Sequence, residues 1–319
     1  MPKKRAKIVS VGTAVPENVV TNFDLEKFLD TSNGWIETRT GISQRHLFPR
    51  QAPGKASDLG IEAARKALQR AGLEACDIDG IICATFTPDN FFPSTACVMA
   101  GALGCKSAFA FDISAACAGF VYGLTVANSM IVSGQCKNVL LIGAEVISRT
   151  LDWTDRSTCI LFGDGAGAVV MSGVESERCG ILGACIASDG TLGDILRLPS
   201  WGENRYMSMK GSEVFKYAVR MMSESTKECL QKSGITKEQI DLLIPHQANM
   251  RIISSLAQHL EMPKEKVITN VQKYGNTSSA SIPLALEQAW EENRIKEDTV
   301  VAFSSLGGGV TVGSAIVRF

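Results

Sequence analysis

Cys117, His246 and Asn276 are the residues of this chain whose types and surroundings could perform nucleophilic chemistry. Cys117 lies in FDISAACAGFVYGL (residues 111–124), which predicts a buried strand, a turn and then a long apolar helix. A helix N-terminus carries unpaired N–H groups and a partial positive charge, which lower the pKa of a thiol and can bind an oxyanion. A buried core cysteine is the alternative, but the alanine and glycine neighbours of Cys117 leave room for another molecule to approach the sulfur.

His246 and Asn276 lie at corresponding places in the second half of the chain. His246 is one of three histidines and directly follows the apolar segment DLLIP (241–245), whereas Asn276 lies between the predicted strand VITNV (267–271) and a predicted helix. Open α/β sheets place their chemistry at the carboxyl ends of strands. A structural role is the default for each residue alone. If the two halves pack about a pseudo-two-fold axis, however, the three side chains can converge on one catalytic site.

The composition excludes several classes of protein. The chain has 319 residues, a formal net charge of −1 and 45% hydrophobic residues, values typical of a globular protein and not of a nucleic-acid-binding protein. Its ten cysteines form no C-x-x-C pair, so we expect no metal site and no disulfide framework. The apolar run after Lys3–Arg5 is too short for a signal peptide, and we expect a reduced, cytoplasmic protein.

Two segments could be misread. No charged residue lies between Asp112 and Lys137, but Ser and Asn interrupt this run, so we expect a helix buried in the core and no membrane association. GDGAG (163–167) lacks the G-x-G-x-x-G spacing of a dinucleotide motif, and we expect no cofactor.

Apolar periodicity predicts the remaining elements. We expect an amphipathic helix from Ser57 to Ala71, ended by Gly72. TSNGWIETRTGI (31–42) is interpreted as a polar loop. Further strands are expected over residues 7–14, 78–86, 137–146 and in the glycine-rich region near 163–171.

The chain contains an internal repeat. Residues 68–72 and 78–81 match residues 230–234 and 240–243 at a constant offset of 162, as between Gly72 and Gly234. The same offset maps Cys117 onto Ser279. A duplication of two α/β halves is the simplest explanation, and we place them at residues 1–175 and 176–319.

Six motifs make the chain resemble the thiolase superfamily, and most closely the β-ketoacyl-acyl-carrier-protein synthases III, over essentially its whole length. They are TSNGWIETRTGI, DISAACAGF, LFGDGAGAVV, IPHQAN, YGNTSSAS and GGGVTVGSAIVRF. The resemblance implies an α/β fold with the thiolase-like, duplicated five-layer αβαβα architecture. It also implies that Cys117 is the acylated nucleophile, and that His246 and Asn276 bind the thioester carbonyl of the second substrate. The backbone N–H groups of Cys117 and Gly308 would form an oxyanion hole.

The same resemblance implies the substrate contacts. Phe92 would close the acyl pocket across the interface of a homodimer. The positions near the coenzyme A nucleotide are Trp35, Arg39 and Arg156, and those along the pantetheine tunnel are Gly211, Phe215 and Asn249.

Four further positions bear on the expected binding of substrates and of the carrier protein. Ser157 stands where some relatives have Gly, and Leu306 stands where a Phe often shields the active site. Lys216 and Arg251 neighbour the tunnel mouth and could form a basic patch for the acidic acyl carrier protein, although a solvated helix surface is an equal alternative.

The implied reaction is a decarboxylative condensation of an acyl-CoA primer with malonyl-acyl-carrier-protein through an acyl-cysteine. Three related or similar enzyme classes are disfavoured. A thiolase would need a second cysteine near Ser304–Leu306, and elongating ketosynthases use two histidines where this chain has one histidine and Asn276. An α/β-hydrolase elbow would need glycine at position 115, which is alanine here. A non-catalytic binding protein is disfavoured because all three catalytic positions are filled. A specialised-metabolism relative that uses malonyl-CoA or an unusual primer remains the alternative.

Overall fold

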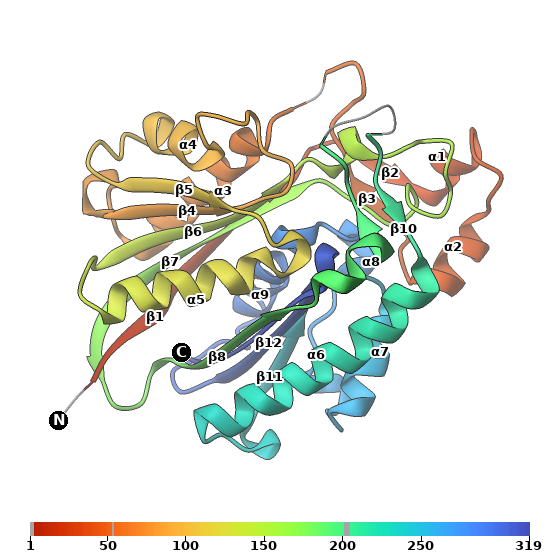
Figure 1. Cartoon of the computed structure of the whole chain (residues 1–319). Helices are drawn as coiled ribbons and strands as arrows, with labels where there is room; N and C mark the ends of the chain where they lie inside the picture. Colours follow the sequence, from red (N-terminus) through yellow and green to blue (C-terminus); the bar gives the residue numbers. More distant parts are fainter. Residues whose placement is uncertain (1–2, 53, 201–204) are drawn as a thin grey trace.

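Two large sheets lie face to face with two helices between them (Figure 1). The computed structural model describes residues 3–52, 54–200 and 205–319. The first sheet contains, in spatial order, β1 (Lys3–Ala14), β7 (Gly165–Ser176), β6 (Asn138–Glu145), β4 (Gly80–Ala84) and β5 (Phe109–Ile113). The second sheet contains β11 (Leu242–Pro245), β12 (Val300–Gly307), β13 (Thr311–Arg318) and β8 (Gly180–Ser188).

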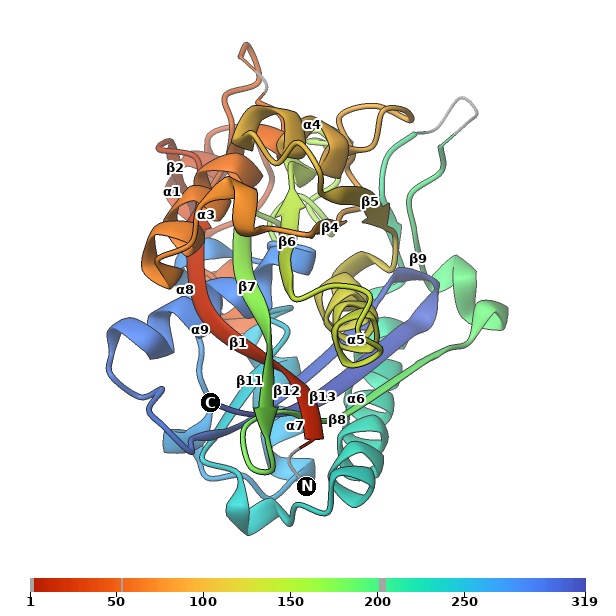
Figure 2. The same cartoon turned by 90° about the vertical axis from the view of Figure 1, so that its left-hand side faces the viewer.

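Helices form three layers around these sheets (Figures 1 and 2). The central pair, α5 (Gly119–Val132) and α9 (Ser281–Glu291), contacts strands of both sheets. The outer layers are α3 (Ala56–Ala71) with α4 (Thr95–Leu103), and α6 (Gly211–Ser233) with α7 (Met250–His259). The five-layer αβαβα architecture that the resemblance implied is therefore confirmed.

The central layer explains why α5 is mostly apolar. Phe120, Val121 and Leu124 are fully buried, and the Phe120 ring packs edge-on against Phe303 of β12 at 6.3 Å. Burial of each such side chain contributes roughly 1.5–3 kcal/mol. The run without charges is thus a core helix, as predicted. No helix in the three described ranges is long and apolar enough to span a bilayer.

The remaining elements are short and lie mostly between the sheets and the surface. The strands are β2 (Val19–Thr21), β3 (Gln44–His46), β9 (Leu196–Arg197) and β10 (Ser208–Met209), and the helices are α1 (Asn22–Glu26), α2 (Asn33–Thr40) and α8 (Val271–Tyr274). The 3₁₀ helices are η1 (Ala75–Asp77), η2 (Ala116–Ala118), η3 (Ile147–Thr150), η4 (Gly190–Ile195), η5 (Lys237–Gln239), η6 (Lys264–Lys266), η7 (Ser278–Ala280) and η8 (Gly308–Val310).

The offset of 162 residues relates much of one half to the other. Gly72 and Gly234 end α3 and α6 at nearly equal φ of 65° and 67°. Asp79 accepts a hydrogen bond from the backbone N of Asn138 at 2.8 Å, and Asp241 accepts the corresponding bond from Val300 at 2.8 Å. The pairs η1 and η5, η2 and η7, and β6 and β12 begin at the same offset. The boundary between residues 175 and 176 stays a prediction.

The predicted loop over residues 31–42 is wrong, because most of it forms α2. Ser32 caps this helix by accepting a hydrogen bond from the backbone N of Trp35 at 3.2 Å, and Gly41 ends it at φ 74°. Polar residues cover most of the helix, so apolar periodicity does not reveal it, whereas the Ser cap and the glycine do. In contrast, α3 was predicted correctly except that it begins one residue before Ser57.

The predicted strand VITNV is also wrong. Only Val267 forms an isolated bridge, with Leu243, and α8 begins at Val271. The buried Gln247 side chain explains the difference, because its Nε2 donates to Ile268 O at 3.2 Å and its Oε1 accepts from Asn270 N at 2.9 Å. One side chain thus satisfies backbone groups that a neighbouring strand would otherwise pair.

Candidate active site

Cys117 lies in η2, between the end of β5 and the first residue of α5, as the sequence predicted. Its side chain is buried, and the preceding Ala116 has a φ of 45°, a region that non-glycine residues rarely adopt. Gly307 lies against this turn so closely that a Cβ atom there would be 2.7 Å from Cys117 N. Thr311 Oγ1 donates to Ala115 O at 2.9 Å. The C-terminal glycines therefore fit the backbone that presents the cysteine.

Cys117, His246 and Asn276 line one cavity of about 110 Å³. His246 follows β11 directly, and its backbone N donates to Ser304 O at 2.8 Å. The three residues come from η2, the end of β11 and the turn before η7. The convergence predicted from the repeat is thus present in the structure.

Asn276 is fixed in a defined orientation. Its backbone N donates to Leu161 O at 2.8 Å, and its backbone O accepts from Gly163 N at 3.0 Å. Its side-chain Oδ1 accepts from Ser278 N at 2.8 Å. Because the oxygen is occupied, Nδ2 remains as the donor that a ligand can use.

A single hydroxyl controls the orientation of the His246 ring. His246 Nδ1 lies 2.7 Å from Ser281 Oγ, and that oxygen also accepts a weak bond from Gln247 N at 3.4 Å. A hydroxyl that donates to Nδ1 places the ring proton on Nε2. Burial lowers the pKa of His246 to about 3. The imidazole is therefore neutral at physiological pH, and Nε2 is the donor when Ser281 donates to Nδ1.

The Cys117 thiol differs from the sequence-based expectation. Its pKa is raised to about 12, chiefly by burial; a hydrogen bond with the Ser278 hydroxyl lowers the pKa and the nearby Glu145 carboxyl raises it. The prediction that the helix N-terminus yields a low thiol pKa is wrong for the free protein, because desolvation of the thiolate is the larger effect.

Glu145 is a fully buried carboxyl beside this site. Its oxygens accept hydrogen bonds from Thr85 Oγ1 at 3.2 Å, Thr87 Oγ1 at 2.7 Å, Phe86 N at 3.2 Å and Ser279 Oγ at 2.9 Å. Burial nevertheless raises the pKa of Glu145 to about 7, against the lowering by these bonds. Glu145 thus joins the loop after β4 to η7 of the other half.

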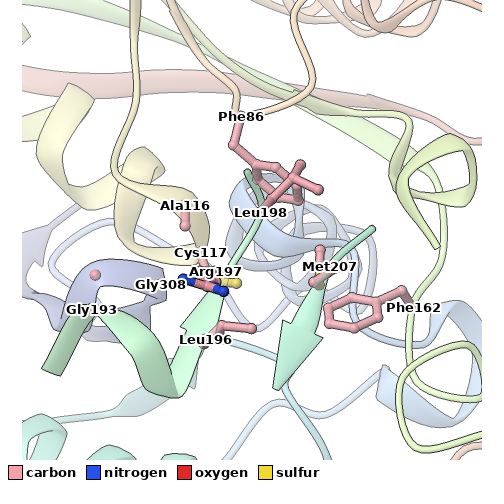
Figure 3. A pocket seen from close by; sticks show the side chains of 11 residues that line it. Phe86, Ala116, Cys117, Phe162, Gly193, Leu196, Arg197, Leu198, Met207 and Gly308 are labelled. Carbon is pink, nitrogen blue, oxygen red and sulfur yellow. The ribbon is translucent and has the colours of Figure 1, made fainter. Parts of the chain in front are cut away.

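A second cavity of about 260 Å³ is also lined by Cys117 (Figure 3). Gly308 of η8 lines it together with Cys117. The large apolar side chains around it are Phe86, Phe162, Leu196, Leu198 and Met207. Such a lining suits an acyl chain attached to the sulfur.

The residues expected near a nucleotide lie together at the surface. The guanidinium of Arg39 is 4.5 Å from the centre of the Trp35 ring, and that of Arg156 is 5.1 Å from it. Arg156 also bonds Asp30 Oδ2 at 3.3 Å. Ser157 is exposed beside this group.

The expected tunnel residues divide between two hollows. Gly211 and Asn249 line the catalytic cavity, and Asn249 Oδ1 also caps α7 by accepting from Ile252 N at 2.9 Å. Phe215 lines a neighbouring groove, where the Arg251 guanidinium is 5.4 Å from its ring.

Leu306, Phe92 and Lys216 lie in three different environments. Leu306 is buried and lines the catalytic cavity. Phe92 is 87% exposed and lines neither cavity beside Cys117 within this single chain. Lys216 is exposed on α6.

Sequence reasoning missed Ser278, Ser281 and Glu145 as parts of the site. The repeat offset of 162 could have found them, because it pairs Ser278 with Ala116, Ser281 with Gly119, and Glu145 with Gly307. Ser278 and Ser281 thus correspond to residues of the segment around Cys117, and Glu145 corresponds to the last residue of β12.

Comparison with known proteins identifies the family. Residues 111–190 match the family model described as 3-oxoacyl-[acyl-carrier-protein (ACP)] synthase III, and residues 230–319 match the model of its C-terminal part. A β-ketoacyl-[acyl-carrier-protein] synthase III of Aquifex aeolicus (strain VF5) is 49% identical over 313 residues, covering 98% of this chain and 99% of the relative. The synthase III of Geobacillus kaustophilus (strain HTA426) is 49% identical over 314 residues, with the same coverage.

Solved structures agree with this assignment. The crystal structure of the Aquifex aeolicus 3-oxoacyl-[acyl-carrier-protein] synthase III has a TM-score of 0.94 and 48% identity, covering 98% of this chain and all of that one. A priming β-ketosynthase of a polyketide biosynthetic pathway has a TM-score of 0.93 and 32% identity, covering 100% of this chain and 98% of that one. The chain belongs to the 3-oxoacyl-[acyl-carrier-protein] synthase III family.

Proposed function

We propose that this chain initiates fatty acid synthesis by condensing an acyl-CoA primer with malonyl-acyl-carrier-protein through an acyl-Cys117 intermediate. The observation that carries the proposal is that Cys117, His246 and Asn276 line one cavity, while the sulfur also borders an apolar cavity of about 260 Å³. The first cavity suits a polar reacting group and the second suits the acyl chain.

In the first half-reaction, the Cys117 thiolate attacks the carbonyl carbon of the acyl-CoA thioester. A C–S bond to Cys117 forms, the C–S bond to CoA breaks, and the departing CoA sulfur takes up a proton. The backbone N–H groups of Cys117 and Gly308 are proposed to stabilise the oxyanion that forms in this step.

In the second half-reaction, the malonyl thioester loses carbon dioxide and becomes an enolate. The Nε2–H of His246 and the Nδ2–H of Asn276 are proposed to donate to the enolate oxygen. The enolate carbon then attacks the acyl carbonyl, and Cys117 leaves as the thiolate. Decarboxylation supplies the carbanion, so the site needs donors and no strong base, which agrees with a neutral imidazole.

The proposal extends to binding residues and partners. Trp35, Arg39 and Arg156 would hold the coenzyme A nucleotide, because two guanidinium groups beside an indole suit an adenine and phosphates. The pantetheine arm would pass Gly211, Phe215 and Asn249. The acyl carrier protein would dock near Lys216 and Arg251, and no cofactor is needed.

We also propose a cytoplasmic homodimer. β5 is an edge strand of the first sheet, and an exposed edge strand is a natural site for pairing with another chain. Phe92 is exposed in the single chain, and it would reach the partner's acyl pocket in such a dimer.

A second candidate function is an enzyme of specialised metabolism that takes malonyl-CoA or an unusual primer. The likeness to the priming β-ketosynthase, at 32% identity over the whole chain, favours keeping it. The chemistry at Cys117 would be unchanged, and only the substrates would differ.

One experiment tests the reaction and separates the two candidates. The protein is incubated with a panel of acyl-CoAs, and the mass of the Cys117 peptide is measured before and after malonyl-carrier protein or malonyl-CoA is added. We expect an acyl adduct on Cys117 that disappears with release of a β-ketoacyl product when malonyl-carrier protein is added. Cys117→Ala should give neither signal. Turnover with malonyl-CoA alone would support the second candidate, and the absence of any adduct would contradict both.

A further inference from the structure

The Ser278 hydroxyl is an anomaly of the site. Ser278 is fully buried, and its Oγ makes no hydrogen bond of ordinary geometry with any described residue. A buried hydroxyl without a partner costs about 1–3 kcal/mol, and most buried polar groups are paired. A serine kept at such a cost requires an explanation.

Ser278 lies in a segment that packs against the nucleophile. Ser278 lies in η7, which packs against η2, the short helix that carries Cys117. A hydrogen bond with the Ser278 hydroxyl lowers the pKa of the Cys117 thiol, which agrees with this packing. The orphan donor and the reactive sulfur are therefore neighbours across the boundary between the two halves.

The backbone of Ser278 is fixed by two features. Its φ is 51°, in the left-handed region, and its N–H donates to Asn276 Oδ1 at 2.8 Å. One residue thus orients Asn276 through its main chain and belongs to the segment that packs against the turn of Cys117. The equivalent position in the first half is Ala116, which has nearly the same φ of 45° and no hydroxyl. The hydroxyl is thus not required for this backbone conformation.

We infer that Ser278 is a further catalytic residue, whose hydroxyl donates a hydrogen bond to the Cys117 sulfur whenever that sulfur is a thiolate. This occurs before acylation and again when Cys117 leaves after condensation. The hydroxyl makes no bond of ordinary geometry in the resting enzyme, whereas a thiolate is a stronger acceptor than a thiol, because hydrogen bonds to charged groups are the stronger ones. Ser278 neither gains nor loses a proton: the proton lost by the thiol is balanced by the one that the CoA sulfur takes up.

The inference rests on the proposed nucleophilic role of Cys117. A purely structural role makes a different prediction, because removal of an unpaired buried hydroxyl should be neutral or stabilising and should not alter the thiol. The two roles therefore differ in what happens to the reactivity of Cys117.

The test is the pH dependence of Cys117 alkylation by iodoacetamide, read from the mass of its peptide, in the wild type and in Ser278→Ala. The apparent pKa should rise in the variant, and acylation by acyl-CoA should slow by about 10- to 100-fold, as loss of a hydrogen bond to a charged group predicts. Alanine suits the backbone, as Ala116 shows. Ser278→Gly is a second variant that also accepts a positive φ.

Ser305→Ala is the matched control, because it removes an equally buried hydroxyl that donates to Gly313 O at 3.1 Å. It should leave the alkylation profile unchanged. If Ser278→Ala and Ser278→Gly fold and show the wild-type profile and acylation rate, the inference is overturned, while the proposed function stands. If wild-type Cys117 is not acylated at all, the proposed function fails first.

Discussion

His246 Nδ1 and Ser281 Oγ lie 2.7 Å apart, and this contact connects the end of β11 to the first residue of α9. Both side chains are buried. The contact holds Nδ1 and leaves Nε2 as the ring nitrogen without a protein partner among the described residues, and a hydroxyl that donates to Nδ1 places the ring proton on Nε2. The proposed role of His246 as a donor therefore depends on Ser281.

Ser281→Ala should impair condensation more than acylation. Without the hydroxyl, both tautomers of His246 become available and the ring loses one constraint. We expect malonyl decarboxylation to slow by about 10-fold, the size of one hydrogen bond of roughly 1.4 kcal/mol. Carbon dioxide release and acyl-Cys117 mass are measured side by side. A variant in which both rates fall equally would indicate a general disturbance of the fold.

His246→Ala and Asn276→Ala should separate the two half-reactions further. Each variant should still form acyl-Cys117, whereas decarboxylation should fall by about 10²-fold or more, as removal of an oxyanion donor usually causes. Asn276→Asp should be worse than its shape suggests, because a carboxylate repels the enolate. Equal loss of both steps in a folded Asn276→Ala protein would refute the division of roles.

Glu145→Gln should change how stability depends on pH. The folded-state pKa of Glu145 is raised to about 7 from 4.5, so the carboxyl binds a proton more tightly in the folded state. Its contribution to stability is then complete below about pH 4.5 and is lost as pH rises through 7. His246 acts oppositely, because its pKa is lowered and stability falls as pH drops below 6.5.

The difference between wild type and Glu145→Gln isolates the carboxyl, since His246 is common to both. Urea unfolding is measured from pH 5 to 8. Wild type should lose stability relative to the variant as pH rises, and the apparent pKa of the Cys117 thiol should be lower in the variant. Parallel pH profiles for the two proteins would show that Glu145 does not titrate in this range.

Phe92→Ala should favour longer primers if Phe92 closes the acyl pocket of a partner. Each additional methylene that fits gains roughly 0.8 kcal/mol. The panel of acyl-CoAs gives the chain-length preference, and sedimentation gives the oligomeric state. Phe91→Ala alters the neighbouring exposed aromatic and serves as the control. An unchanged preference, or a monomer in solution, would contradict this role.

Lys216→Glu and Arg251→Glu should slow the reaction with malonyl-carrier protein while acylation by acyl-CoA stays nearly unchanged. Charge reversal opposes the association of an acidic partner, and the effect should be larger at low salt. Lys232→Glu is a control on the same helix, because Lys232 pairs with Glu228 near the far end of α6. Equal losses with both substrates, or equal effects of Lys232→Glu, would argue against docking at this surface.

The sequence by itself determined the repeat, the core elements and the three residues around the catalytic cavity. The strand–turn–helix around Cys117 was predictable because the apolar runs, the small residues beside the cysteine and Gly134 after the helix are local signals. The offset of 162 residues predicted the correspondence of η2 with η7, since duplicated halves keep the same spacing. The polar helix α2 and the absence of a strand at residues 267–271 were not predictable from apolar periodicity.

Tertiary structure alone decided the state of the reacting groups. The thiol pKa of Cys117 depends on how completely the two halves exclude water, and the tautomer of His246 depends on Ser281, which lies 35 residues further along the chain. Burial, unpaired donors and distances between separate elements arise only when the layers pack together. A local sequence pattern can name the nucleophile, but the desolvation and the hydrogen bonds that set its reactivity are properties of the assembled core.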